Sequence, residues 1–210
     1  MTFAYSAPAT ASLISRNFSG QMKWDMSFER INSAQFLHLS LKAMNASRDE
    51  EAMAFLAALL EREPEHAQAN YLLAAQHAQL GMLDQAEAGF RKATALVGDD
   101  FPMPRFQLGQ LLMVQDRPGE AVDVLLPLTH ALDPALRAYA NAFIALAAQQ
   151  VGDAIAALRE GLQHPQSVPA LADDMRRLAA DLERSLGVPD EAPAITRSAA
   201  SMLLSNYQKH

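Results

Sequence analysis

The 210-residue chain contains no cysteine. Disulfide bonds, thiolate zinc sites and cysteine nucleophiles are therefore excluded, and the redox compartment is left open. Aromatic residues are also scarce, at 7% of the chain, although 50% of the residues are hydrophobic and alanine is abundant. Because small alanine side chains let helices approach closely, this composition favours packed helices over a β-sandwich.

Long apolar runs and an excess of positive charge are missing as well. No uninterrupted apolar stretch approaches the roughly 18 residues of a membrane-spanning helix, so we expect no membrane span. Residues 1–18 lack the basic and continuously apolar regions of a secretory signal. A cytoplasmic location is therefore expected, with an organelle-targeting segment as the alternative. The net charge of −7 argues against general binding to nucleic-acid phosphates, so no nucleic-acid partner is expected.

Motifs of catalysis are absent too. The six histidines form no HExxH motif and no pair four residues apart, and the chain has no GxGxxG motif, P-loop or GxSxG motif. His77 falls at a helix-packing position, and the acidic run of Glu61, Glu63 and Glu65 is typical of a solvated helix end. We therefore expect no catalytic residue, no metal and no cofactor, and an enzyme is the least favoured reading.

A repeated alanine is the most regular feature that the chain does have. The alanines recur with steps of 34, 35 and 33 residues, at Ala52, Ala86, Ala121 and Ala154. A bulky apolar residue lies four residues after each one: Leu56, Phe90, Leu125 and Leu158. A small residue lies twelve residues before each one: Ser40, Ala74, Gly109 and Ala142. A period near 34 with such offsets predicts a stack of helix–turn–helix units.

Helix signals divide the chain around these alanines. We expect a flexible arm at 1–27, a repeat array at 28–166 with units at about 33–66, 67–101, 102–134 and 135–166, a capping helix at 167–187, and a linker with a C-terminal amphipathic segment at 188–210. Gly81 is expected to end a helix, and Asp84 and Asp153 to cap the helices that follow two of the turns. Pro127 should kink or shorten its helix.

The pattern resembles that of tetratricopeptide repeats. The second unit carries the clearest match: Leu73, Ala74, His77, Gly81, Ala86, Phe90 and Ala93. The fourth unit is the weakest, because Asn141 stands where leucine is usual and Gly161 where alanine is usual. The resemblance covers residues 33–166 and implies an all-α fold, an α-solenoid of about four antiparallel helix pairs followed by a C-terminal capping helix.

In this family the first helix of each pair lines a concave groove. Carried over by register, the groove positions are Leu37, Leu41, Met44, Tyr71, Ala75, Ala78, Met103, Phe106, Gln110, Met113, Leu136, Tyr139, Phe143 and Leu146. The set is apolar and has no lysine, which disfavours the subclass that clamps C-terminal carboxylates with lysine and asparagine. An apolar groove suits an amphipathic helix or an extended apolar peptide.

The resemblance implies a non-catalytic adaptor or scaffold that binds a protein or peptide partner in this groove. The alternative is a secretion-type chaperone that shields apolar segments of client proteins. Three other readings of the apolar groove positions stay open: they are core residues, two copies cover each other as a homodimer, or the chain covers itself. Self-docking would use the C-terminal segment 194–207, or the N-terminal arm with Phe18, Met22, Trp24 and Met26.

Overall fold

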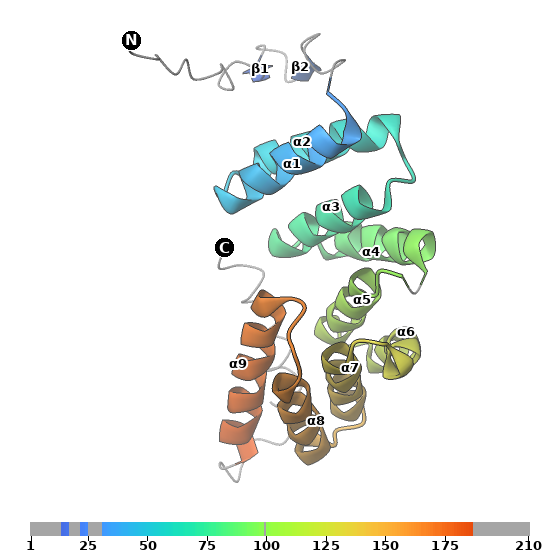
Figure 1. Cartoon of the computed structure of the whole chain (residues 1–210), viewed down its shortest axis with the longest axis vertical. Coiled ribbons are helices and arrows are strands. Elements are labelled where there is room, and N and C mark those ends of the chain that lie inside the picture. Colours follow the sequence, from blue (N-terminus) through green and yellow to red (C-terminus); the bar gives the residue numbers. More distant parts are fainter. Residues whose placement is uncertain (1–13, 17–21, 25–30, 99, 187–210) are drawn as a thin grey trace, which may run out of the picture.

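The computed structural model describes residues 14–16, 22–24, 31–98 and 100–186. Its helices are α1 (Ser33–Asn45), α2 (Asp49–Arg62), α3 (Ala67–Gln79), α4 (Leu83–Val97), α5 (Met103–Val114), α6 (Pro118–Leu125), the 3₁₀ helix η2 (Leu126–His130), α7 (Pro134–Ala147), α8 (Val151–Gln163) and α9 (Pro169–Leu186). Each α-helix from α1 to α9 packs against its neighbours along the chain, and the pairs stack in sequence order (Figure 1). The expected all-α solenoid of antiparallel helix pairs is confirmed.

Two short strands precede the helices. β1 (Ile14–Arg16) and β2 (Met22–Trp24) pair antiparallel, with Ile14 opposite Trp24 and Arg16 opposite Met22. The sequence pattern did not predict them. The rest of the arm predicted as flexible, and the C-terminal segment 188–210, lie outside the residues that the structure describes.

The repeated alanines lie in the core. All four alanines and the four bulky residues that follow them are fully buried. The small residues twelve positions earlier are buried as well. In the third pair the reason is visible, because a Cβ added to Gly109 would overlap the side chain of Leu125 on the partner helix. A small residue on the first helix therefore makes room for a large one on the second.

The turn inside each of the four pairs has the same backbone. Its left-handed residue lies five positions before the repeated alanine: Ser47, Gly81, Asp116 and Gln149, with φ values of 53°, 73°, 58° and 60°. In the third turn the Asp116 N–H donates to the carbonyl of Met113, and the Arg117 N–H donates to the carbonyl of Leu112. The other three turns repeat both hydrogen bonds at matching positions. This is the Schellman arrangement, and glycine supplies the left-handed residue in only one turn.

These turns fix where the second helix of each pair begins. α4 begins at Leu83, after Met82, and α8 begins at Val151, after Gln150, so the prediction that Asp84 and Asp153 are N-caps is wrong. Both aspartates lie inside the first turn of their helices, where a negative charge is still favourable. The prediction for Pro127 is confirmed, since α6 ends at Leu125 and the chain continues as η2.

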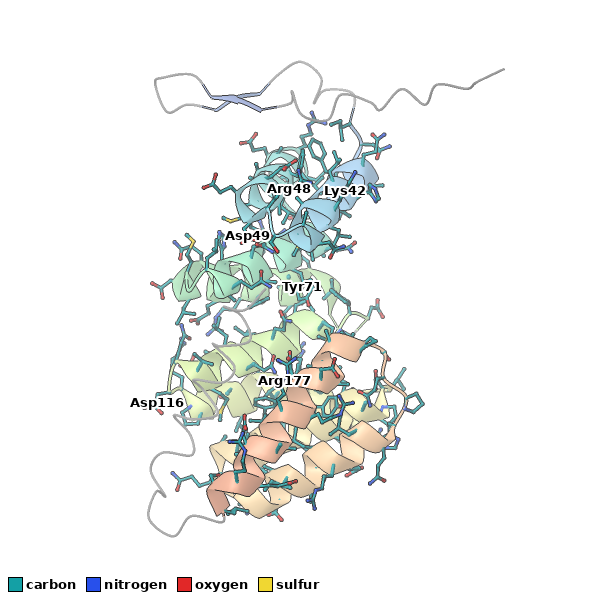
Figure 2. The ribbon with its side chains drawn as sticks, turned by 90° about the vertical axis from the view of Figure 1, so that its left-hand side faces the viewer. Lys42, Arg48, Asp49, Tyr71, Asp116 and Arg177 are labelled. Atoms are coloured by element: carbon teal, nitrogen blue, oxygen red, sulfur yellow. The ribbon has the colours of Figure 1, made fainter. Side chains whose placement is uncertain are left out.

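The buried side chains form two apolar clusters. The first contains Phe36, Phe55, Leu56, Ala58, Leu59, Ala69 and Leu72, from α1, α2 and the start of α3. The second runs from Ala74 to Leu182 and contains most of the buried apolar residues between them, including Met175, Leu178 and Leu182 of α9. Tyr71 packs against both clusters and lies on α3 between the first pair and the later helices (Figure 2). Its ring meets that of Phe90 at 6.1 Å and that of Phe101 edge-on at 5.2 Å.

A charged cluster joins the second and third pairs on the surface. Arg117 donates to Glu87 of α4 and to Glu120 of α6, each at 2.7 Å, and Arg91 of α4 also donates to Glu87 at 2.7 Å. The hydrogen bond from Arg117 is the largest cause that lowers the pKa of Glu87. The carboxylate is therefore stabilised between two guanidinium groups that reach it from successive pairs.

Candidate partner-binding surface

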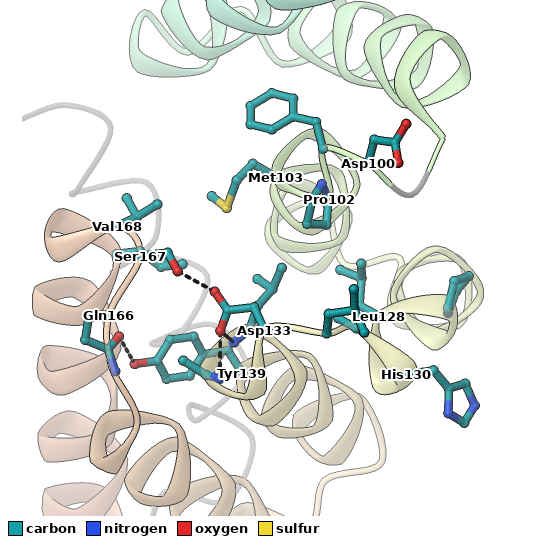
Figure 3. Close-up of a pocket in the computed structure, with 17 residues that line it drawn as sticks. Asp100, Pro102, Met103, Leu128, His130, Asp133, Tyr139, Gln166, Ser167 and Val168 are labelled. Carbon is teal, nitrogen blue, oxygen red and sulfur yellow. Dashed lines mark hydrogen bonds between the residues drawn. The ribbon is translucent and has the colours of Figure 1, made fainter.

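A cavity of about 640 Å³ lies where the N-terminal ends of α5, α7 and α9 meet (Figure 3). Each of these helices begins at or beside a proline: Pro102 precedes α5, Pro134 is the first residue of α7, and Pro169 is the first residue of α9. Proline suits this position because the first helical N–H has no partner within the helix. We call this space the apolar cavity.

Asp133 holds two walls of the apolar cavity together. Its Oδ1 atom accepts hydrogen bonds from the N–H groups of Ala135 and Leu136, at 2.9 and 3.1 Å, and so caps α7. Its Oδ2 atom accepts a hydrogen bond from the Ser167 hydroxyl at 2.7 Å, in the segment before α9 (Figure 3). One carboxylate therefore fixes the start of α7 relative to the start of α9.

Tyr139 and Gln166 close another side of the cavity. The Tyr139 hydroxyl donates to Gln166 Oε1 at 2.7 Å, and Gln166 Nε2 donates to the carbonyls of Gly161 and His164 at 2.8 and 2.6 Å. The Tyr139 ring lies against Gly161, where an added Cβ would overlap it. Burial raises the pKa of Tyr139. The ring thus occupies space that is free because residue 161 is glycine and has no side chain.

The lining and rim of the cavity are mainly apolar. Met103, Leu136 and Leu171 line it, and Val168 and Leu132 form part of its rim. Leu132 is 99% exposed and Val168 39% exposed. Asp100 and Asp133 give the lining its acidic groups, and the described residues that line the cavity include no lysine or arginine. The surface therefore offers a mainly apolar hollow with two acidic side chains in its lining.

Three residues predicted to lie in the groove line this cavity: Met103, Leu136 and Tyr139. Phe106, Gln110, Met113, Phe143, Ala78 and Leu146 are buried, as are Leu136 and Tyr139. The rings of Phe106 and Phe143 meet edge-to-face at 5.5 Å and pack α5 against α7. Leu136 and Tyr139 nevertheless line the cavity, whereas Phe106, Gln110, Met113, Phe143, Ala78 and Leu146 are covered by other side chains of the chain and do not line it.

The groove positions on the first two pairs are more accessible. Leu41 is 39% exposed. Leu37, Met44, Tyr71 and Ala75 are half-buried. Burial raises the pKa of Tyr71 to about 12. Binding of a partner in the groove remains a prediction. It is compatible with the accessible groove residues on α1 and α3 and with those that line the cavity.

Two residues of this surface, Leu132 and Val168, were not predicted from the sequence. Both precede a helix start, Leu132 before the Asp133–Pro134 cap and Val168 before Pro169. Helical periodicity identifies residues within helices and carries no signal for a leucine in the connection before one. Both lie in connections between helices, at the cavity where three helix ends meet.

Within the described ranges, no group of three or more His, Asp or Glu side chains is placed to hold a metal ion. His77 is half-buried in α3, and burial lowers its pKa. Of the helices that the structure describes, none is both long enough and apolar enough to cross a bilayer.

Comparison with known proteins identifies the fold. No protein-family model matches the chain, and no curated protein matches it. Three solved structures of MamA do resemble it. The fold is TPR-like. A crystal structure of MamA has a TM-score of 0.52 at 17% identity and covers 80% of this chain and 90% of its own.

The other two structures agree with the first. A double mutant of MamA RS-1 has a TM-score of 0.54 at 17% identity, covering 82% of this chain and 93% of its own. MamA 41-end from Desulfovibrio magneticus RS-1 has a TM-score of 0.55 at 18% identity, covering 82% and 92%. At these identities the likeness shows the arrangement of helices and no more.

Proposed function

We propose that this protein is a non-catalytic adaptor that binds an apolar segment of a partner protein at the apolar cavity. The observation that carries the proposal is the fully exposed Leu132 in the lining of an open apolar hollow, to which the partly exposed Val168 also contributes. Helix-pair arrays commonly use extended surfaces of this kind to hold other proteins. The groove positions Leu37, Leu41, Met44, Tyr71 and Ala75 would extend the contact toward the first pair.

The partner's chemistry follows from the hydrogen bonds around the cavity. The Asp133 carboxylate, the Tyr139 hydroxyl and the Gln166 amide already have partners within the chain. These groups are satisfied without a ligand, and an apolar side chain would fill the hollow without breaking any of their hydrogen bonds. We therefore infer that leucine-like side chains of an amphipathic helix or extended peptide enter the cavity.

Leu132 makes the proposal testable without disturbing the fold. Because its side chain is 99% exposed, Leu132→Ser removes almost no contact within the chain. Burial of a leucine side chain against a partner stabilises the complex by roughly 1.5–3 kcal/mol. The substitution should therefore weaken partner binding by roughly 10- to 100-fold.

The experiment begins with a photoreactive amino acid at position 132, which captures the partner in cells of the native host. The captured protein is then purified, and its affinity is measured by calorimetry for the wild-type chain, Leu132→Ser and Leu80→Ser. Leu80 is a matched control, since it is 48% exposed at the end of α3, outside the cavity. Equal affinities of all three chains would refute the proposal.

A third variant measures how far the contact extends. Leu41→Ser weakens binding only if the partner follows the groove as far as α1. The number of captured proteins distinguishes the two functions: one stable partner supports an adaptor, and many unrelated apolar clients with the same dependence on Leu132 support the chaperone alternative.

A further inference from the structure

The C-terminal segment that follows α9 has the composition that the cavity requires. Four of its apolar residues, Ile195, Ala199, Met202 and Leu203, fall on one face of a helix over residues 194–208. From residue 192 onward the printed sequence contains Arg197, Lys209 and His210 and no aspartate or glutamate. The segment is therefore both apolar and basic.

The cavity has the complementary character. Its floor is apolar, its acidic groups are Asp100 and Asp133, and no lysine or arginine is found among the described residues that line it. An apolar and basic helix matches such a surface in both respects. Opposite charges at the edge would favour this occupant over an acidic one.

Residues 187–208 are also long enough to reach from the end of α9 back to the cavity. α9 begins beside the cavity, where Val168 and Leu171 contribute to the lining, and it ends at Leu186. Its far end lies about 26 Å from its start at ~1.5 Å per residue. The seven residues 187–193 can span up to about 24 Å. A helix over 194–208 would be about 22 Å long, so the segment can return along α9 to the cavity.

We propose that residues 194–208 fold back along α9 as an amphipathic helix and place Met202 and Leu203 in the apolar cavity. The chain then covers its own partner-binding surface, and a partner binds by displacing this helix. The inference rests on the proposed function only for that last step, because docking of the segment can be measured without any partner.

Because the chain contains no cysteine, a thiol-reactive cross-linker can react only at the cysteines that are introduced. In the full chain, Val168→Cys is combined with Met202→Cys and treated with a short bismaleimide. Leu41→Cys with Met202→Cys is the matched control, because Val168 and Leu41 are both 39% exposed and Leu41 lies on α1. We expect the Val168 pair to form an intramolecular cross-link in at least about tenfold higher yield, unchanged on dilution.

Two further variants separate specific docking from chance collision. Added to the Val168 pair, Leu203→Asp should lower the yield by about tenfold, because a charge would enter the apolar hollow. Ser201→Asp places the same charge on the opposite face of the helix and should leave the yield unchanged. Equal yields for the Val168 and Leu41 pairs, insensitivity to Leu203→Asp, or cross-links only between two copies would each overturn the proposal.

The outcome also separates this inference from the proposed function. If the segment docks while Leu132→Ser leaves partner affinity unchanged, the cavity is covered but is not the partner site, and only the proposed function fails. If Leu132 controls partner affinity while the Val168 and Leu41 pairs cross-link equally, only the self-docking helix fails. If both hold, Leu203→Asp should raise partner affinity, because the competing segment is released.

Discussion

The turn inside each helix pair requires a left-handed residue, and Gly81 is the position where this requirement can be measured cleanly. Gly81 has φ 73°, and no atom lies within 4 Å of the place that a Cβ would occupy. The effect of Gly81→Ala is therefore one of backbone conformation alone. An L-residue in this conformation costs about 1–2 kcal/mol, partly offset by the ~0.4–1 kcal/mol gained because alanine restricts the unfolded chain.

We accordingly expect Gly81→Ala to lower the free energy of unfolding by about 1 kcal/mol. Gly119→Ala is the matched control: Gly119 lies in α6, has equally open space around it, and has no left-handed backbone. It should raise the free energy of unfolding by ~0.5–1 kcal/mol. The difference between the two variants cancels the effect of alanine on the unfolded chain and isolates the cost of the left-handed conformation.

The other turns allow the reverse experiment. Ser47→Gly, Asp116→Gly and Gln149→Gly should each stabilise the chain. The native residues have a left-handed backbone conformation that costs them free energy and that glycine adopts without this cost. The gain should be smallest for Asp116, since aspartate tolerates this region better than glutamine does. Asp116 lies at the turn between α5 and α6 (Figure 2). The measurement is urea unfolding followed by circular dichroism, and equal midpoint shifts for Gly81→Ala and Gly119→Ala would refute the reasoning.

Three further outcomes follow from the contacts described. Phe90→Ala should lower the free energy of unfolding by ~3–5 kcal/mol because the ring is fully buried, whereas Leu96→Ala in the same helix, 36% exposed, should change it by less than about 1 kcal/mol in thermal unfolding. Tyr139→Phe should cost about 1 kcal/mol in urea unfolding, since only the hydroxyl hydrogen bond is lost. The pKa of Glu87 is lowered in the folded chain by Arg117, so its contribution is complete above the ordinary value of 4.5 and lost as the pH falls through the folded pKa. Glu87→Gln should therefore weaken the acid dependence of the urea midpoint, and an unchanged dependence would contradict the assignment.

The sequence predicted the architecture because buried contacts repeat in it. Ala52, Ala86, Ala121 and Ala154 are fully buried, and the bulky residues four positions after them are buried as regularly. Pro127 correctly located the end of α6. Such local and periodic constraints act within one unit, so they can be recognised without the tertiary structure.

What the sequence could not show lies in the turns and in contacts between units. Three of the four left-handed turn residues are not glycine, so their conformation carried no signal, and the prediction that Asp84 is an N-cap is wrong because α4 already begins at Leu83. Phe106 and Phe143 are buried because α5 and α7 lie side by side. Leu132 lies in the connection before α7, where helical periodicity carries no information on exposure. The candidate site was therefore predicted only in part.

The division of the core into two clusters has a consequence for cooperativity. The first pair buries its own set of side chains and meets the rest of the array through α3, where Tyr71 contacts both clusters. In an array whose units contact only their neighbours, the free energy that opens an end unit is set by its one interface. We therefore expect the amide hydrogens of α1 and α2 to exchange through an opening of their own. The free energy of that opening should be lower than the free energy of the opening that exposes α5 and α7, and the contacts of Tyr71 should determine how strongly the two openings are coupled.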